Sequence, residues 1–258
     1  MVPNSHPREE WHLHTRRVGR TVLIFDRLDS TNSFAAALAH DVANDGTVIL
    51  ADEQTAGRGQ YGRRWQCPPG SGILMSVLLF PAAHLRRPAL LTAWAAVSAC
   101  DAIRETTGLA GTIKWPNDVL VRGKKVCGVL IEQGMGTVAG IGINVNQTAE
   151  SLANAGLPFA GSLAQFSEKM INKQSLTRIL IETLDRELDR LCRGDCAGLE
   201  MNWKARIALL GKRVKVTSLE QMHQGCLLDI RWEGLDLLQV DGQITRLALE
   251  TVRQVEEL

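Results

Sequence analysis

The chain has 258 residues, 45% of them hydrophobic and 22% charged, which is ordinary for a soluble globular protein with room for a large domain and a small one. Its net charge of +1 provides no overall basic field, so the composition argues against DNA or RNA as a partner. The most membrane-like run, residues 89–100, is too short to span a bilayer.

Residues 1–20 are polar and lack the apolar core of a signal peptide, so we expect a flexible N-terminal segment and a cytoplasmic protein. The six cysteines are scattered along a chain without secretion signals, which favours reduced thiols over a disulfide framework. Cys192 and Cys196 lie four residues apart with no second pair nearby, so a zinc site is not expected.

The first predicted strand covers residues 21–25, and a short alanine-rich helix follows over residues 33–39. Between them lies Asp29-Ser30-Thr31-Asn32, in which Ser30, Thr31 or Asn32 suits the helix N-cap. Capping alone explains this string. Residues 48–50 and 73–80 predict two further strands, the second of them buried.

A glycine-rich and arginine-rich loop, residues 51–65, joins these two strands. Its three closely spaced glycines permit unusual backbone angles and let N–H groups approach a ligand. Arg58, Arg63 and Arg64 supply cationic forks that suit a phosphate or a carboxylate. Taken alone, the loop is explained equally well as a mobile surface segment with solvated arginines.

After this loop the chain predicts a long helix over residues 87–107, closed by Gly108. A short strand over residues 112–115 stops at Pro116. Residues 119–121 and 126–131 then read as a hairpin with a glycine turn, and residues 137–145 as another strand. Strands with few helices between them indicate an α+β fold with a mixed sheet.

Residues 146–174 are expected to be irregular, followed by an amphipathic helix from Ser175 and a second helix over residues 198–210. Beyond Gly211, short strands are predicted at residues 213–217, 226–230, 237–240 and 244–249, a spacing that suits a small SH3-like β-barrel. We therefore expect a flexible segment at residues 1–20, a catalytic domain at 21–210 and a barrel at 211–258.

Five stretches taken together, over roughly residues 20–258, resemble the biotin protein ligases, also called biotin–[acetyl-CoA-carboxylase] ligases. They are Asp29–Asn32, the GRGxxGRxW string of residues 57–65, the KWPND string of residues 114–118, Lys124–Glu132 and Gly140–Asn146. The resemblance implies a mixed-sheet catalytic domain of the biotin/lipoate ligase type followed by an SH3-like barrel. Some similar ligases carry a DNA-binding helix-turn-helix domain and repress transcription, but residues 1–20 leave no room for one before the first strand, so we expect a ligase without a repressor function.

The implied activity has two steps. Biotin and ATP form biotinyl-5′-AMP and release pyrophosphate, and a specific lysine of the biotin carboxyl carrier protein of acetyl-CoA carboxylase then takes the biotin. Mg²⁺ is expected, held mainly by the ATP phosphates, because hard cations prefer phosphate oxygens. The sequence leaves open whether Asp118 or solvent takes the proton of the carrier lysine.

The resemblance also assigns site residues. Lys125 is the expected catalytic cation, bridging the biotin carboxylate and the α-phosphate, and Arg58 shares this role. The implied biotin-binding residues are Ser30, Thr31, Asn32, Gln54, Gly57, Arg58, Gly59, Gln60, Lys125, Gly128, Gly140 and Gly142. The implied ATP-binding residues are Trp65, Lys114, Asn117, Asp118, Lys125 and Asn144.

One position departs from the family pattern. The residue after Arg58-Gly59 is often basic, whereas here Gln60 can form hydrogen bonds but brings no charge. We expect the loop to become ordered over the ligands and to protect the acyl-adenylate from water. Because Gln60 carries no charge, the sequence does not fix how firmly this loop holds the acyl-adenylate.

Three other functions remain alternatives at this point. A lipoate or octanoate ligase or transferase shares a similar catalytic fold, although the GRGxxGRxW and KWPND strings favour biotin. A non-catalytic biotin sensor would not need an intact Lys125, and a pure interaction module would leave the central loop unexplained. An exposed strand edge can serve either a homodimer or the carrier domain.

Overall fold

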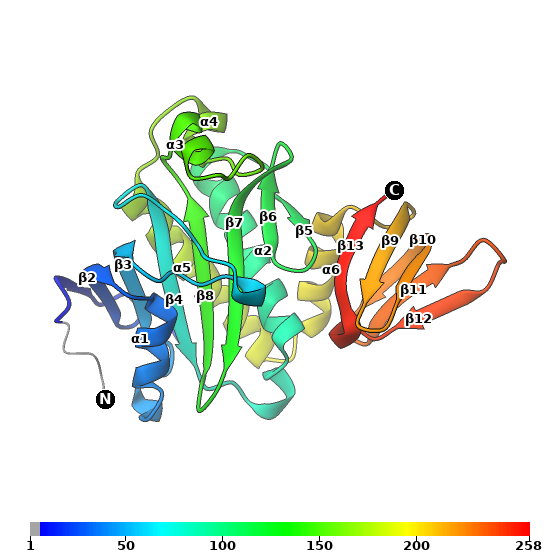
Figure 1. Ribbon diagram of the computed structural model, residues 1–258. Helices are drawn as coiled ribbons and strands as arrows, with labels where there is room; N and C mark the ends of the chain where they lie inside the picture. Colours follow the sequence, from blue (N-terminus) through cyan, green and yellow to red (C-terminus); the bar gives the residue numbers. More distant parts are fainter. Residues whose placement is uncertain (1–5) are drawn as a thin grey trace.

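The computed structural model describes residues 6–258, which form two β-sheets with helices packed around the larger one (Figure 1). The larger sheet has the strand order β1-β2-β3-β4-β8-β7-β6-β5. Its strands are β1 (Glu9–Trp11), β2 (Val22–Leu28), β3 (Val48–Gln54), β4 (Gly72–Leu79), β5 (Thr112–Lys114), β6 (Asp118–Val121), β7 (Lys124–Gln133) and β8 (Thr137–Asn144). The helices are α1 (Thr31–Leu38), α2 (Pro88–Thr107), α3 (Ala149–Asn154), α4 (Leu163–Ser167), α5 (Lys173–Cys192) and α6 (Cys196–Ile207).

The pairing confirms the predicted mixed sheet. Strands β2 and β3 are parallel, with α1 as their crossover, and the other neighbours are antiparallel. The predicted hairpin between β6 and β7 turns at Arg122 and Gly123, both with positive φ. Within residues 6–258, short 3₁₀ turns lie at Val42–Asn44, Gln60–Gly62, Ala83–Leu85 and Leu249–Thr251.

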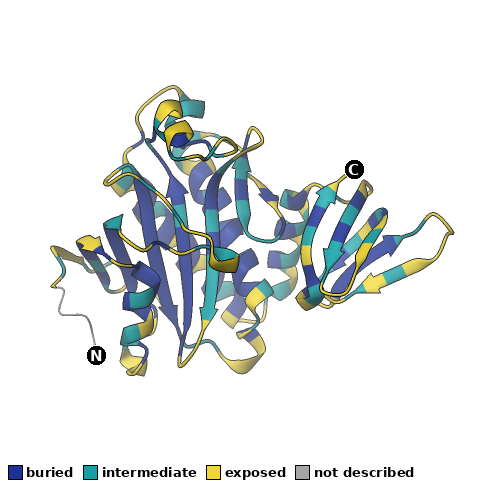
Figure 2. Cartoon of the chain, in the orientation of Figure 1, coloured by how far each residue is buried: buried dark blue, intermediate teal, exposed yellow. Residues whose placement is uncertain are grey.

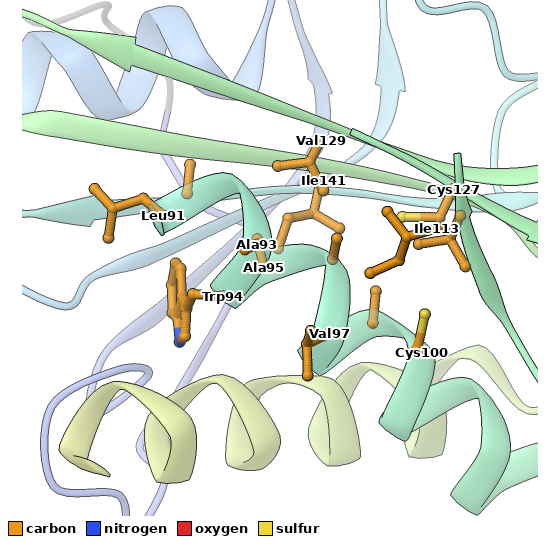
Figure 3. Packing of buried hydrophobic residues seen from close by; sticks show 14 of the residues in the cluster. Leu91, Ala93, Trp94, Ala95, Val97, Cys100, Ile113, Cys127, Val129 and Ile141 are labelled. Carbon is orange, nitrogen blue, oxygen red and sulfur yellow. The ribbon is translucent and has the colours of Figure 1, made fainter. Parts of the chain in front are cut away.

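Helices α2 and α5 cover one face of this sheet and enclose the main apolar core (Figure 3). Helix α2 is apolar nearly all round because the sheet lies on one side of it and α5 and α6 on the other. Trp94 is fully buried there, and its Nε1 donates to the Leu184 carbonyl of α5 at 3.0 Å. Within residues 6–258, no helix combines the length and apolarity needed to cross a membrane.

The opposite face is covered only in part. Helix α1 packs there on a smaller core that contains Phe25, Phe34, Ile49 and Leu78. Beside α1, the sheet is covered by a loop rather than by a helix: the loop after β3 crosses in front of β8 and β7 (Figure 1). The strands beneath are largely buried while parts of the loop are exposed, as Figure 2 shows. A hollow therefore remains between loop and sheet.

The N-terminal segment differs from the expectation of flexibility. Residues 1–5 lie outside the described part, but Glu9–Trp11 form β1 and pair with Val22–Ile24 at the sheet edge. The backbone N–H groups of Arg16, Arg17 and Val18 donate to the buried carboxylate of Asp185 in α5. This anchor depends on a residue far along the chain, so local composition did not predict it.

Between β8 and α5 the chain is more regular than expected, since α3 and α4 lie within residues 146–174. Thr148 caps α3 by accepting from Ser151 N, the local signal for this short helix. Helix α5 begins at Lys173, two residues before the expected start, because Asn172 accepts from Ser175 N and caps it. Helix α6 is displaced toward the N-terminus relative to the expected range of 198–210.

Residues beyond Gly211 form the second sheet, antiparallel throughout, with the order β12-β11-β10-β9-β13. Its strands are β9 (Arg213–Ser218), β10 (Met222–Arg231), β11 (Gly234–Leu238), β12 (Ile244–Leu247) and β13 (Val252–Glu257). The sequence predicted four of these strands and missed β13. In this order β12 and β13 are the two ends, so the pairings of the described residues form a small open sheet rather than a closed barrel.

Three tryptophans connect the second sheet to the first. Trp203 of α6 stacks on Trp232, which follows β10, with ring centroids 5.1 Å apart. The ring centroid of Trp203 also lies 5.6 Å from that of Trp115 in the KWPND string. Arg253 of β13 also lies over the ring of Tyr61 in the central loop, at 5.3 Å. The second sheet thus contacts the central loop directly and reaches the KWPND string through Trp203 of α6.

Candidate functional site

The hollow is a cavity of about 270 Å³ on the α1 face of the large sheet. Most of the predicted site residues line it: Ser30, Thr31, Asn32, Gln54, Arg58, Gly59, Gln60, Trp65, Asn117, Asp118, Lys125, Gly128, Gly140, Gly142 and Asn144. Two do not. Gly57 is buried within the loop, and Lys114 is exposed on the edge strand β5. Residues far apart in the sequence are thus brought together as the motifs predicted.

The central loop is folded as a tight hairpin. Gly59 N donates to the Arg63 carbonyl at 2.7 Å, and Trp65 N donates to the Gly57 carbonyl at 3.1 Å. Tyr61 and Gly62 turn the chain with φ of 57° and 75°. Gly57 is needed for packing, because a Cβ there would lie 2.5 Å from the Trp65 carbonyl oxygen. The hairpin directs Arg58 and Trp65 toward the cavity.

Trp65 lies on a floor made of two glycines. Gly128 of β7 and Gly142 of β8 are register partners, so their missing side chains leave one flat area. A Cβ at Gly142 would come 2.4 Å from Trp65 Cε2, and one at Gly128 would come 2.9 Å from Cζ3. The buried Nε1 of Trp65 has no hydrogen-bond partner in the described chain. The Trp65 ring therefore covers the glycine floor and borders the cavity.

One end of the cavity is a buried polar pocket at the start of α1. Thr31 donates to Gln54 Oε1 through its backbone N at 2.7 Å and through Oγ1 at 3.0 Å. Asn32 is only 5% exposed and lies against Gly140, where a Cβ would come 2.3 Å from its Oδ1. Ser30 is the N-cap of α1, which confirms that capping role. The pocket offers donors and acceptors without charge.

Ser76 of β4 completes this pocket and was missed in the sequence. Its Oγ donates to Asn32 Oδ1 at 2.5 Å and forms a hydroxyl–hydroxyl contact of 2.7 Å with Thr31 Oγ1, and the side chain is fully buried. A single serine inside the apolar run of residues 73–80 was the available signal. Buried hydroxyl groups need partners, so a serine in a buried strand marks a polar neighbour.

Lys125 lies at the other end of the cavity. Lys125 Nζ lies 2.6 Å from Asp118 Oδ1 and 5.5 Å from the centre of the Trp65 ring. Its Cε would be 3.2 Å from a Cβ at Gly128, so the lysine stands beside the glycine floor. Asp118 holds the ammonium in place, while the lysine side chain stays one-third exposed to incoming anions.

Asn117, Asn144 and Lys114 lie at or beside strand ends. Asn117 Nδ2 donates to the Val129 carbonyl at 2.7 Å and ties the end of β6 to β7. Asn144 Oδ1 accepts from Gln147 Nε2 at 3.0 Å and is buried. Lys114 is the register partner of Asp118, so it stands on the same face just outside the cavity. Turn and strand packing therefore account for part of the KWPND string.

The wall near Lys125 comes from a segment to which the sequence assigned no role. Leu157 and Ala160 line the cavity, and the segment pairs with the start of β7. Lys125 N donates to the Phe159 carbonyl at 3.0 Å, and Gly161 N donates to the Lys125 carbonyl at 2.9 Å. These backbone bonds fix the base of Lys125. The string Gly-Leu-Pro-Phe-Ala-Gly carries no chemical signal that predicts this contact.

Comparisons with known proteins agree with this geometry. Residues 24–147 match the model of the biotin/lipoate A/B protein ligase family. The bifunctional ligase/repressor of Bacillus subtilis (strain 168) is 31% identical over 241 residues, covering 91% of this chain and 74% of that protein. The biotin–[acetyl-CoA-carboxylase] ligase of Paracoccus denitrificans is 34% identical over 206 residues, covering 73% of this chain and 81% of that protein.

A solved structure extends the likeness to nearly the whole fold. The biotin protein ligase of Aquifex aeolicus, in complex with biotin and ATP, superposes with a TM-score of 0.79 and 26% identity. The match covers 92% of this chain and 99% of that one. Together with the motifs and the cavity, these matches show that the chain belongs to the biotin protein ligases of the biotin/lipoate A/B protein ligase family.

Proposed function

We propose that the protein is an ATP-dependent biotin protein ligase that forms biotinyl-5′-AMP and transfers biotin to a lysine of a biotin carboxyl carrier protein. The observation that carries this proposal is the layout of the cavity, with an uncharged polar pocket at one end and Lys125 at the other. Gly140 under Asn32 and Gly142 under Trp65 are two residues apart on β8, a separation of about 7 Å. A ring with a short acid chain fits such a floor.

In the first step, an oxygen of the biotin carboxylate attacks the α-phosphorus of ATP, and the bond to the β-phosphate oxygen breaks to release pyrophosphate. Two anionic groups must approach, so fixed cations near the reacting atoms lower the barrier. Lys125 serves this role from β7 and Arg58 from the loop, while Trp65 faces the adenine. The polar pocket holds the ureido ring, which both donates and accepts hydrogen bonds.

In the second step, the neutral ε-amine of the carrier lysine attacks the acyl carbon of the adenylate. The bond to the AMP oxygen breaks, AMP leaves, and the amine loses a proton.

Residues 6–258 contain no cluster of three His, Cys, Asp or Glu side chains placed to hold a metal ion. We therefore propose that Mg²⁺ enters with ATP and is held mainly by its phosphate oxygens.

The reaction is proposed to take place in the cytoplasm, where thiols stay reduced, because all six cysteines of the protein are free. Six free thiols suit a reducing compartment, and none of them is needed for the chemistry above. The partner in this proposal is the carrier domain, which must bring its lysine to the mouth of the cavity beside Lys125.

Pyrophosphate release tests the first step on its own. We expect release that requires both biotin and ATP and that falls about 10²–10³-fold in Lys125→Ala, the usual cost of losing one charge-stabilising group. Lys124→Ala is the matched control, because Lys124 is exposed and does not line the cavity; its Nζ donates to the Pro158 carbonyl. Release that requires lipoate and ignores biotin would assign the lipoate alternative instead.

A further inference from the structure

Glu132 lies on β7 at the junction between the polar pocket and the central loop; it ends the Lys124–Glu132 stretch of the resemblance, which assigned it no role. Its Oε2 accepts from Asn32 Nδ2 at 2.7 Å and from Arg58 Nη2 at 2.9 Å. One carboxylate oxygen thus joins a pocket residue on α1 to the arginine of the loop. Glu132 is outside the cavity lining, so it reaches the site only through these two neighbours.

The Asn32 side of this junction is rigid. Ser76 donates to Asn32 Oδ1, and the amide is pressed against the bare backbone of Gly140. The side chain is buried, so its Nδ2 cannot exchange Glu132 for water. The position of the Glu132 carboxylate is therefore set by the same amide that forms the wall of the polar pocket.

The Arg58 side is adjustable. Its side chain is 43% exposed and rises from a loop whose local bonds are few, so an exposed ion pair by itself would hold it weakly. A carboxylate already fixed by Asn32 loses less freedom when it binds the guanidinium, which makes the pair stronger than an isolated one. Among the described residues, Glu132 is the carboxylate that pairs with Arg58.

We propose that Glu132 is a positioning residue that aims Arg58 at the reacting carboxylate and phosphate, and that it ties this aim to the Asn32 amide of the polar pocket. The proposal rests on the proposed function, because it assigns Arg58 to the adenylation step. Because Ser76 and Gly140 already fix the Asn32 amide, the carboxylate that holds Arg58 is in place before a ligand binds.

Glu132→Gln tests this proposal because it keeps the size of the side chain and removes the charge that holds Arg58. We expect kcat for biotinyl-5′-AMP formation to fall about tenfold, the result of a misplaced cation. KM for biotin should change less than about twofold, because the pocket hydrogen bonds remain, so the effect falls on kcat. Glu53→Gln is the matched control: Glu53 pairs with Arg27 at 3.4 Å and is 34% exposed, against 35% for Glu132.

A double-mutant cycle with Arg58→Ala separates positioning from a general structural effect. If Glu132 acts through Arg58, Glu132→Gln lowers kcat by less than about twofold further in the Arg58→Ala background. A full tenfold loss in that background, or equal losses in biotin affinity and kcat, would overturn the proposal. Should Glu132→Gln fail to fold, Glu132→Asp enters the same cycle, since it keeps the charge and shortens the reach.

The two proposals fail in different ways. A wild-type protein that makes no biotinyl-5′-AMP would contradict the proposed function before any variant is compared. A wild-type protein that makes it, together with an additive cycle, would contradict only the role of Glu132. A fall in kcat for Glu132→Gln that disappears in Arg58→Ala, with Glu53→Gln unchanged, would support both.

Discussion

On β8, Ala139, Ile141 and Ile143 lie in the core against α2 and α5, while Gly140 and Gly142 face the cavity. The same alternation runs along β7 and β4, where the helix side is apolar and the cavity side carries glycines, Ser76 and Glu132. Both faces belong to the same strands, so the backbone that is held rigid by one face supports the other.

The two faces of the large sheet place different demands on their side chains. The helix face needs apolar volume, and its residues stabilise the fold through burial. The cavity face needs positions without a side chain, supplied by the glycines, and polar groups with well-placed hydrogen-bond partners. These residues contribute little apolar burial. Substitutions on the two faces should therefore separate stability from activity, and the variants below test that separation.

The largest effect is expected on the helix face. Ile143→Ala removes a fully buried side chain from the main core and should lower the free energy of unfolding by about 2–5 kcal/mol. Urea unfolding measures this loss, and turnover per folded molecule should be retained well below the melting temperature. An activity lost in proportion to the change in stability would break the separation of the two faces.

Gly142→Ala on the neighbouring residue should do the opposite. The new Cβ would lie 2.4 Å from Trp65, so the ring must leave its floor, and adenylation should fall about 10²-fold. Stability should change by less than about 1 kcal/mol because the displaced loop can move into solvent. Gly134→Ala is the control, since nothing lies within 4 Å of its Cβ position. Pyrophosphate release should therefore fall sharply in Gly142→Ala and not in Gly134→Ala.

Two buried serines offer a smaller and closely matched pair. Ser76→Ala breaks the hydrogen bonds to Thr31 and Asn32 and should weaken biotin binding about tenfold, as measured by calorimetry. Ser98 of α2 is equally buried, but its hydroxyl has no hydrogen-bond partner within residues 6–258. Ser98→Ala should leave biotin affinity unchanged. Equal losses in the two variants would argue against a special role for the cavity face.

The mildest test leaves the sequence unchanged and compares cysteines. Burial raises the pKa of the Cys100 thiol to about 12 and raises the pKa of Cys127 as well, so both should stay protonated and protected from a maleimide at about pH 8. Cys192 is exposed at the end of α5 and should label first. Peptide mass spectrometry reads the order. Early labelling of Cys127 would show that the helix face is not closed to water.

Sequence patterns predicted the elements whose residues bury themselves. Short continuous apolar runs indicated the inner strands, and the long alanine-rich run indicated α2, because these signals depend on near neighbours. Strand β1 was missed because it has only three residues, and β13 because it pairs with β9, a strand remote from it in sequence. Flexibility was wrongly expected for residues 16–18 because their anchor, Asp185, is remote in sequence.

The site was predictable where motifs carry it and not elsewhere. Lys125, Arg58 and the glycines of β7 and β8 were expected in one cavity and lie there. Lys114 and Gly57 were included by their motif but lie outside the lining. Ser76 and Glu132 were missed because a lone serine in a strand and an acid near a strand end have common structural explanations. Their roles come from contacts across the sheet.

The central claim is that the cavity face performs biotin transfer and depends on Lys125. Intact-mass spectrometry of a biotin carboxyl carrier domain, incubated with the protein, biotin, ATP and Mg²⁺, tests it most directly. We predict a single biotin-sized mass increase that requires ATP and is strongly reduced with Lys125→Ala. An unmodified carrier, or a carrier that Lys125→Ala modifies as fast as the wild-type protein, would contradict it.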